Sequence, residues 1–106
     1  MSLYDENAWV LNDLAGRGSD LSRAKAVDFA HVFPSRALAD IFAREVEGIG
    51  FTTSVNRTER KDDPWDVIAT KVMVPACEGV TQVEEERGDI ARTHKGRPDG
   101  WGFLDE

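Results

Sequence analysis

The sequence has few of the residues that carry metal and redox chemistry. Its 106 residues include one cysteine, Cys77, and two histidines, His31 and His94. A single cysteine excludes a disulfide within the chain, and the composition therefore favours a cytoplasmic location. No C-x-x-C, H-x-x-x-H or calcium-loop spacing occurs. We therefore expect no metal site and no cofactor.

Long apolar runs, a signal peptide and an excess of positive charge are also lacking. A transmembrane helix needs about 20 consecutive apolar residues, and no run approaches that length. The first residues, Met-Ser-Leu-Tyr-Asp-Glu, are acidic and do not have the basic region of a signal peptide. The chain has 20 acidic and 13 basic residues and a net charge of −7. This balance argues against binding to nucleic acid through an overall positive field and suits a basic partner.

What remains is the composition of one small folded domain. Hydrophobic residues make up 41% of the chain, which is too many for a disordered protein. The length allows one domain with a single core. We divide the chain into an N-terminal helical extension over residues 1–17 and a domain over residues 18–106.

Hydrophobic periodicity and turn residues predict a helix followed by the order β-α-β-β-α-β. The N-caps are expected at Asp5 and Ser35. In the first strand, Val27, Phe29, His31 and Phe33 share one face. The predicted elements are a helix over 5–17, a strand over 26–33, a helix over 36–48 with an apolar stripe that includes Ile41 and Ile49, a hairpin over 51–74, a helix from Pro75 that ends at Gly96, and a strand over 97–104.

This order predicts an α+β fold of the ferredoxin-like type. Two right-handed crossover units with a hairpin between them place two helices on one face of a four-stranded antiparallel sheet. The other face must be solvated, covered or used for binding. We expect the N-terminal helix, with Trp9, to shield part of it.

Two chemical interpretations are weaker than a packing role. Cys77 stands at the start of a predicted helix, but no spacing links it to a histidine that would activate it, so no enzyme is expected. RNA-recognition domains share the β-α-β-β-α-β order, and Phe29, Phe33 and Trp65 lie on candidate strands. The ribonucleoprotein signature is absent and the charge is wrong for RNA, so we interpret these aromatic residues as core.

Three stretches together resemble a known family. Gly18-Ser19-Asp20-Leu21 precedes a strand that ends at Phe33-Pro34. A helix then closes with Gly48-Ile49-Gly50-Phe51, and the chain ends on Arg97-Pro98-Asp99-Gly100-Trp101-Gly102. Over about residues 16–104 this pattern resembles the regulator of ribonuclease E activity B, a family of ribonuclease E inhibitors.

The resemblance implies a bacterial, acidic, ferredoxin-like protein of the cytoplasm that is not an enzyme. Such a protein regulates RNA degradation by binding ribonuclease E or an associated degradosome segment. It implies a protein partner, while the charge balance and the lack of a long apolar run predict no direct contact with nucleic acid and no contact with a membrane. Whether the chain is a monomer or a homodimer stays open.

The candidate partner-binding residues are mostly acidic. Glu84, Glu85, Glu86 and Asp89 form a run that would attract a basic segment. Trp101, between two glycines, either closes the core or presents a flat anchor to a partner. The alternative function is a small-molecule-sensing or oligomerising ferredoxin-like domain of unknown role, which would show a paired dimer and an apolar pocket.

Overall fold

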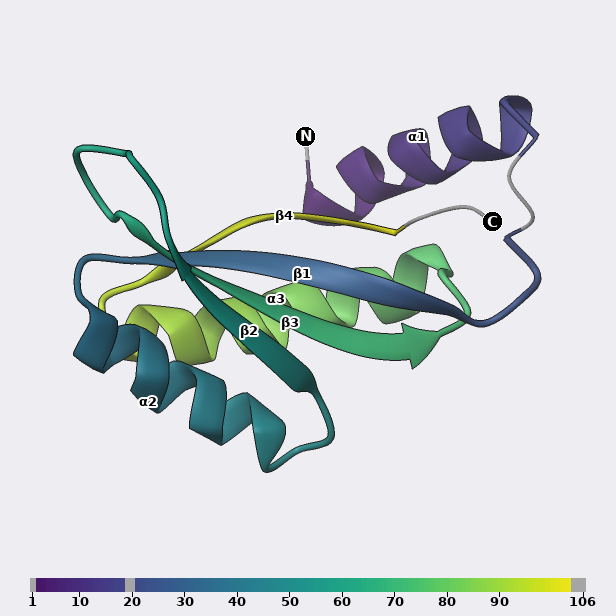
Figure 1. The fold of residues 1–106 in the computed structure, drawn as a ribbon. Helices are drawn as coiled ribbons and strands as arrows, with labels where there is room; N and C mark the ends of the chain where they lie inside the picture. The colour runs from purple at the N-terminus through teal and green to yellow at the C-terminus, as the bar shows by residue number, and fades with distance from the viewer. Residues whose placement is uncertain (1, 19–20, 104–106) are drawn as a thin grey trace.

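The computed structural model describes residues 2–18 and 21–103 and contains three helices and one sheet in this part of the chain (Figure 1). Four strands and two helices follow the first helix in the predicted order. The elements are α1 (Leu3–Gly16), β1 (Lys25–Phe33), α2 (Arg36–Glu47), β2 (Thr52–Arg57), β3 (Trp65–Met73), α3 (Cys77–Thr93) and β4 (Arg97–Phe103).

The four strands form one antiparallel sheet in the order β2-β3-β1-β4. β1 is central and pairs with β3 along its whole length, from Lys25 opposite Met73 to Phe33 opposite Trp65. Its pairing with β4 shifts register between Phe29 and His31. The protein is therefore an α+β fold with a four-stranded antiparallel sheet.

The core lies between one face of this sheet and the helices α2 and α3. Val27, Phe29, His31 and Phe33 are all buried on this face, as the alternation of the first strand predicts. The Phe42 ring of α2 lies 4.6 Å from the His31 ring and 5.0 Å from the Phe33 ring, measured between centroids. Aromatic packing against β1 thus fixes α2 on the sheet.

The buried stripe of α2 differs from the predicted one. Ile41 and Ile49 were expected in the stripe, but they are 42% and 49% exposed. Ala39 and Ala43 are buried instead, beside Phe42. The small alanine side chains let the helix approach the sheet closely. A pattern based on hydrophobicity ranks isoleucine above alanine, and it therefore placed Ile41 and Ile49 in the buried stripe.

The prediction that α1 shields the opposite face of the sheet is wrong. α1 packs against α3 and lies beside β4 at the edge of the sheet (Figure 1). The sheet face opposite α2 and α3, which we call the open face, is therefore left without a covering helix in the described residues. The N-cap also differs, because the Ser2 hydroxyl accepts from the Asp5 amide at 3.1 Å and the helix begins at Leu3.

Other boundaries moved by one to three residues. α3 starts at Cys77 after a cap at Ala76 that makes no side-chain hydrogen bond, and so it starts later than the predicted Pro75. Ser35 caps α2 as predicted, since its hydroxyl accepts from the Leu38 amide at 3.3 Å. Leu104, the predicted end of the last strand, lies outside the described residues. The division of the chain after residue 17 stays a prediction.

Gly96 lies where the chain leaves α3 and enters β4, and it has no room for a side chain. A Cβ atom there would be 2.3 Å from Cε1 of Phe33. Phe33 is fully buried and packs on Phe42, so its ring has no space to move away. The close approach of this turn to β1 therefore requires glycine.

We expect Gly96→Ala to lower the free energy of unfolding by about 2 kcal/mol, because the new methyl group overpacks the core against Phe33. Urea unfolding followed by circular dichroism measures the change. Gly16→Ala is the control, since no atom lies within 4 Å of its added Cβ. A Gly96→Ala variant as stable as the wild type would contradict the close contact.

His31 is a buried histidine that stays neutral in the fold. It is 1% exposed, and its Nδ1 atom has no hydrogen-bond partner. Its pKa is lowered to about 4, mainly by burial and to a smaller extent by the nearby Arg87 charge, against the opposing effect of backbone hydrogen bonds at Phe29 and Val67. The folded state therefore takes up the proton less readily than the unfolded chain does.

A lowered histidine pKa gives stability that is present above the unfolded pKa of about 6.5 and is lost as the pH falls towards the folded value. We expect the wild type to lose about 3 kcal/mol from this group over that range. His31→Phe should lack this loss. Chemical denaturation of both proteins at several pH values measures the difference, and parallel pH profiles would contradict the assignment.

Candidate functional site

The negative charge of the chain is concentrated on two neighbouring helices. α1 and α3 together contain eight acidic and two basic residues, a net charge of −6 out of −7 for the chain. The rest of the sequence is close to balanced, with 12 acidic and 11 basic residues. We call the exposed carboxylates of these helices the acidic surface; its members are Asp5, Glu6, Glu78, Glu85, Glu86 and Asp89.

A buried polar junction holds the two helices and β4 together. The Asn7 amide nitrogen of α1 donates to Thr81 Oγ1 at 3.0 Å and to Glu84 Oε1 at 2.7 Å, both in α3. The Asn7 amide oxygen accepts from Trp101 Nε1 of β4 at 2.8 Å. We call these four residues the Asn7 junction. Asn7 is 3% exposed, so its hydrogen bonds are shielded from water.

The structure separates the predicted acidic residues into two groups. Glu85, Glu86 and Asp89 are exposed, whereas Glu84 is 8% exposed and points into the Asn7 junction. Glu86 accepts from Gln82 and pairs with Arg87 at 2.8 Å, and Asp89 pairs with Arg92 at 2.9 Å. Only the exposed carboxylates are positioned to meet a partner directly.

Glu84 is a carboxyl group in a place that disfavours its charge. Burial raises its pKa, and the neighbouring charges of Glu6 and Glu85 raise it further, while the Asn7 hydrogen bond opposes the shift. No ion pair among the described residues includes Glu84. The side chain therefore has a neutral hydrogen-bond partner and no cation to compensate it.

A hollow of about 450 Å³ opens beside Glu84, between the start of α1, the middle of α3 and the start of β4. Acidic side chains make up half of its lining, and one cation, Arg92, lies at its wall. The lining residues are Leu3, Glu84, Glu85, Asp89, Arg92 and Pro98. This hollow therefore suits a side chain of positive charge.

Trp101 is used inside the fold. Its ring stacks on Phe103 at 6.2 Å between centroids and packs against the core, and its indole N–H is bound by Asn7. The side chain is half-buried, so one part of the ring stays accessible. Its assignment as a partner anchor stays a prediction.

The aromatic residues that suggested RNA binding face the helices. Phe29, Phe33 and Trp65 share the face that packs against α2 and α3. The open face of the described sheet carries no aromatic side chain, and its residues are small, polar or aliphatic. Bases therefore find no stacking platform on that face.

The described residues offer no nucleophile with a base beside it. Cys77 Sγ donates to the Tyr4 carbonyl oxygen at 3.2 Å, and its other neighbour is Thr81. His94 Nε2 lies 2.9 Å from Glu45 Oε1, and His31 is in the core. Within residues 2–18 and 21–103, no group of three or more potential ligands could hold a metal ion. In the same ranges, no helix is both long enough and apolar enough to span a membrane.

Reading the sequence missed the role of Asn7. Asn7 lies between Leu3 and Leu11 at a spacing of four residues, on the face of α1 that packs inward. The helical pattern predicts an apolar residue at this position. A polar residue at such a position was the available signal. Its three partners lie more than 70 residues away in the sequence, and periodicity does not identify them.

The fold and the site define a small α+β domain with an acidic surface on two neighbouring helices. A family model described as Regulator of ribonuclease activity B matches residues 4–103. The chain therefore belongs to this family of ribonuclease regulators, and all of α1 except Leu3 lies within the matched region. A search of the curated proteins finds no match.

We expect Glu84→Gln to stabilise the protein at neutral pH, because glutamine keeps an acceptor for Asn7 and removes a buried charge. A raised carboxyl pKa gives stability at low pH that is lost as the pH rises through the folded value. The gain should therefore shrink as the pH falls towards about 4.3, the usual glutamate pKa. Thermal unfolding across pH measures it.

The matched control for this variant is Glu85→Gln, which makes the same change of charge at an exposed position of the same helix. It should change stability much less. A Glu84→Gln variant that is less stable than the wild type at neutral pH would show that the ionised carboxylate is required at the junction.

Proposed function

We propose that this protein is a regulator without enzymatic activity that binds ribonuclease E, or a degradosome protein associated with it, and lowers ribonuclease activity. Family membership supports the regulatory role. The observation that carries the binding mode is the concentration of a net charge of −6 on α1 and α3. The partner surface is then a basic segment of a protein in the bacterial cytoplasm.

A basic segment would lie along the acidic surface and place one cationic side chain in the hollow beside Glu84. Glu85 and Asp89 line that hollow, and a lysine or arginine there would pair with them. The same cation would compensate the buried carboxylate of Glu84, which has no ion pair among the described residues. Regulation needs no covalent step, because a bound basic segment is withheld from RNA.

We also propose that the architecture is ferredoxin-like. Read from the other edge, the strand order is β4-β1-β3-β2, and α2 and α3 both contribute to the core on one face of the sheet. This order supports the two crossover units expected from the sequence. The extra helix α1 then serves to enlarge the acidic surface.

An oligomerising domain is the second candidate function. β2 is an edge strand that pairs only with β3, and its residues are exposed or half-buried. Such an edge is a place where a second copy could add a strand. Sedimentation of the protein alone distinguishes a dimer from a monomer.

Charge reversal at Glu85 and Asp89 tests the proposed function. We expect Glu85→Lys/Asp89→Lys to bind ribonuclease E of the same organism at least about tenfold more weakly, since like charges replace attractive ones. Its binding should also depend less on salt concentration. Calorimetric titration at several salt concentrations measures both, and inhibition of RNA cleavage should weaken in parallel.

The matched control is Glu59→Lys/Asp62→Lys, which changes the net charge equally at exposed positions of the β2–β3 loop. It should bind almost as the wild type does. Equal weakening by both variants would argue for a general charge effect and against the acidic surface. A wild type that binds neither the ribonuclease nor its associated proteins would overturn the proposed function.

A further inference from the structure

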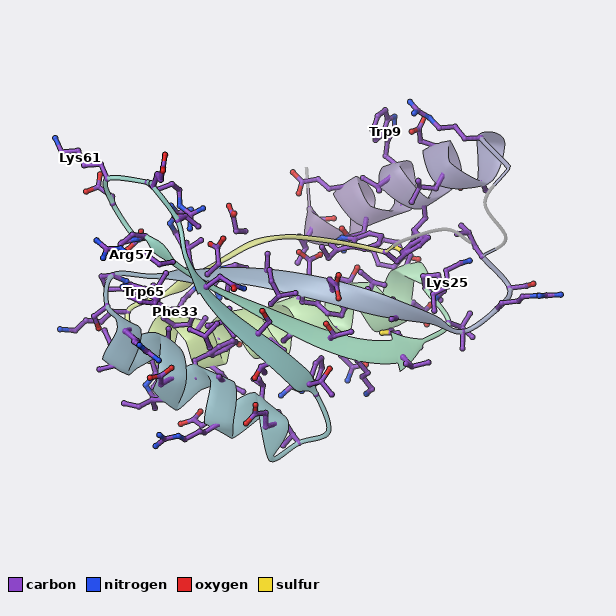
Figure 2. The ribbon with its side chains drawn as sticks, in the orientation of Figure 1. Trp9, Lys25, Phe33, Arg57, Lys61 and Trp65 are labelled. Atoms are coloured by element: carbon purple, nitrogen blue, oxygen red, sulfur yellow. The ribbon has the colours of Figure 1, made fainter. Side chains whose placement is uncertain are left out.

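Trp9 occupies the centre of the solvent face of α1. Asn7 and Leu11 are the buried residues of this helix, and at 3.6 residues per turn Trp9 lies opposite both of them. Its side chain is 67% exposed and extends from α1 away from the sheet (Figure 2). No side-chain hydrogen bond or ring contact involves Trp9 in the described residues, and the core does not include it. The Trp9 ring therefore contributes neither to the core nor to a side-chain contact in the described residues.

Carboxylates flank the Trp9 ring along the helix. Asp5 and Glu6 lie one turn before it and Asp13 lies one turn after it, at the spacings of neighbours on one helix face. Asp13 pairs with Arg17 at 3.1 Å, while Asp5 and Glu6 are exposed members of the acidic surface. An exposed indole among carboxylates attracts a cation by two mechanisms, through the ring and through the charges.

Another tryptophan of this chain, Trp65, makes cation–π contacts with two arginines. The guanidinium groups of Arg36 and Arg57 lie 5.8 and 5.9 Å from the centre of the Trp65 ring. Figure 2 shows Trp65 and Arg57 together at one end of the sheet, far from Trp9 on α1. Trp65 thus has cations from its own chain, whereas no cation–π contact in the described part includes Trp9.

We propose that Trp9 is the anchor for an arginine side chain in a basic segment of a protein partner. This inference rests on the proposed function and names the chemistry that the partner must present. An arginine guanidinium stacks flat on an indole and at the same time donates to a carboxylate, here Asp5 or Glu6. A lysine ammonium fits this arrangement less well, because it is a compact charge without a plane.

The negative charge of α1 and α3 favours an arginine-rich protein segment over a nucleic acid or an anionic lipid as the partner at Trp9. Phosphates of nucleic acids and of anionic lipids are repelled by helices with a net charge of −6. A partner segment rich in arginine meets both features of the face, the exposed ring and the flanking carboxylates. A second copy of this chain could also present arginines to Trp9, and the sedimentation experiment below distinguishes such a dimer from binding to another protein.

The experiment titrates two short synthetic peptides into the intact protein: one alternates arginine with serine and the other alternates lysine with serine. We expect the wild type to bind the arginine peptide more tightly. Trp9→Ala should weaken that binding about tenfold and remove the preference for arginine, the size expected of a desolvated cation–π contact. Trp9→Phe should recover part of the affinity. Because Trp9 is exposed, we expect unchanged thermal unfolding in both variants.

Salt dependence separates this inference from the proposed function. Trp9→Ala removes no charge and should leave the slope of affinity against salt unchanged, whereas Glu85→Lys/Asp89→Lys should reduce it. If the charge variant weakens binding and Trp9→Ala does not, the anchor is wrong and the acidic surface stands. If the wild type binds neither peptide, both are overturned.

The indole N–H signals in a nitrogen–proton NMR spectrum give a direct readout. The chain has three tryptophans, and the Trp9 signal is the one missing from the Trp9→Phe spectrum. The arginine peptide should shift the Trp9 signal and leave those of Trp65 and Trp101 in place. Equal shifts of all three would overturn the anchor. So would sedimentation that shows a dimer of the wild type and a monomer of Trp9→Ala, because the ring would then bind a second copy.

Discussion

The position of the acidic surface depends on the three hydrogen bonds of Asn7. α1 packs mainly on α3. The Asn7 side chain joins it to Thr81 and Glu84 of that helix and to Trp101 of β4. Buried hydrogen bonds of this kind specify one orientation more strictly than apolar packing does. They hold the carboxylates of α1 beside those of α3.

This arrangement has an energetic cost at Glu84. Its buried carboxylate has a raised pKa, because burial and the charges of Glu6 and Glu85 disfavour ionisation. His31 has the opposite effect on pH dependence, since its lowered pKa favours folding at neutral pH and opposes it in acid. His31 lies in the core between the sheet and α2, whereas Glu84 lies at the edge where a partner would bind. The buried carboxyl group whose ionisation is disfavoured, Glu84, therefore lies at the candidate site.

Local signals in the sequence predicted much of the fold and only the outline of the site. The alternation of Val27, Phe29, His31 and Phe33 and the cap at Ser35 are properties of neighbouring residues, so the pattern was sufficient. The acidic run at residues 84–89 was visible in the same way. Its division into buried Glu84 and exposed Glu85, Glu86 and Asp89 depends on where α1 packs, which no local pattern contains.

The sequence alone determined the order of the elements, the excess of negative charge and the resemblance to a family of ribonuclease regulators. Each of these follows from residue identity and short-range spacing. Tertiary structure decided that α1 lies against α3 and leaves the open face of the sheet uncovered, and that Trp9 points to solvent. The physical reason is that hydrogen bonds between Asn7 and residues more than 70 positions away orient α1, and such contacts exist only once the sheet has formed.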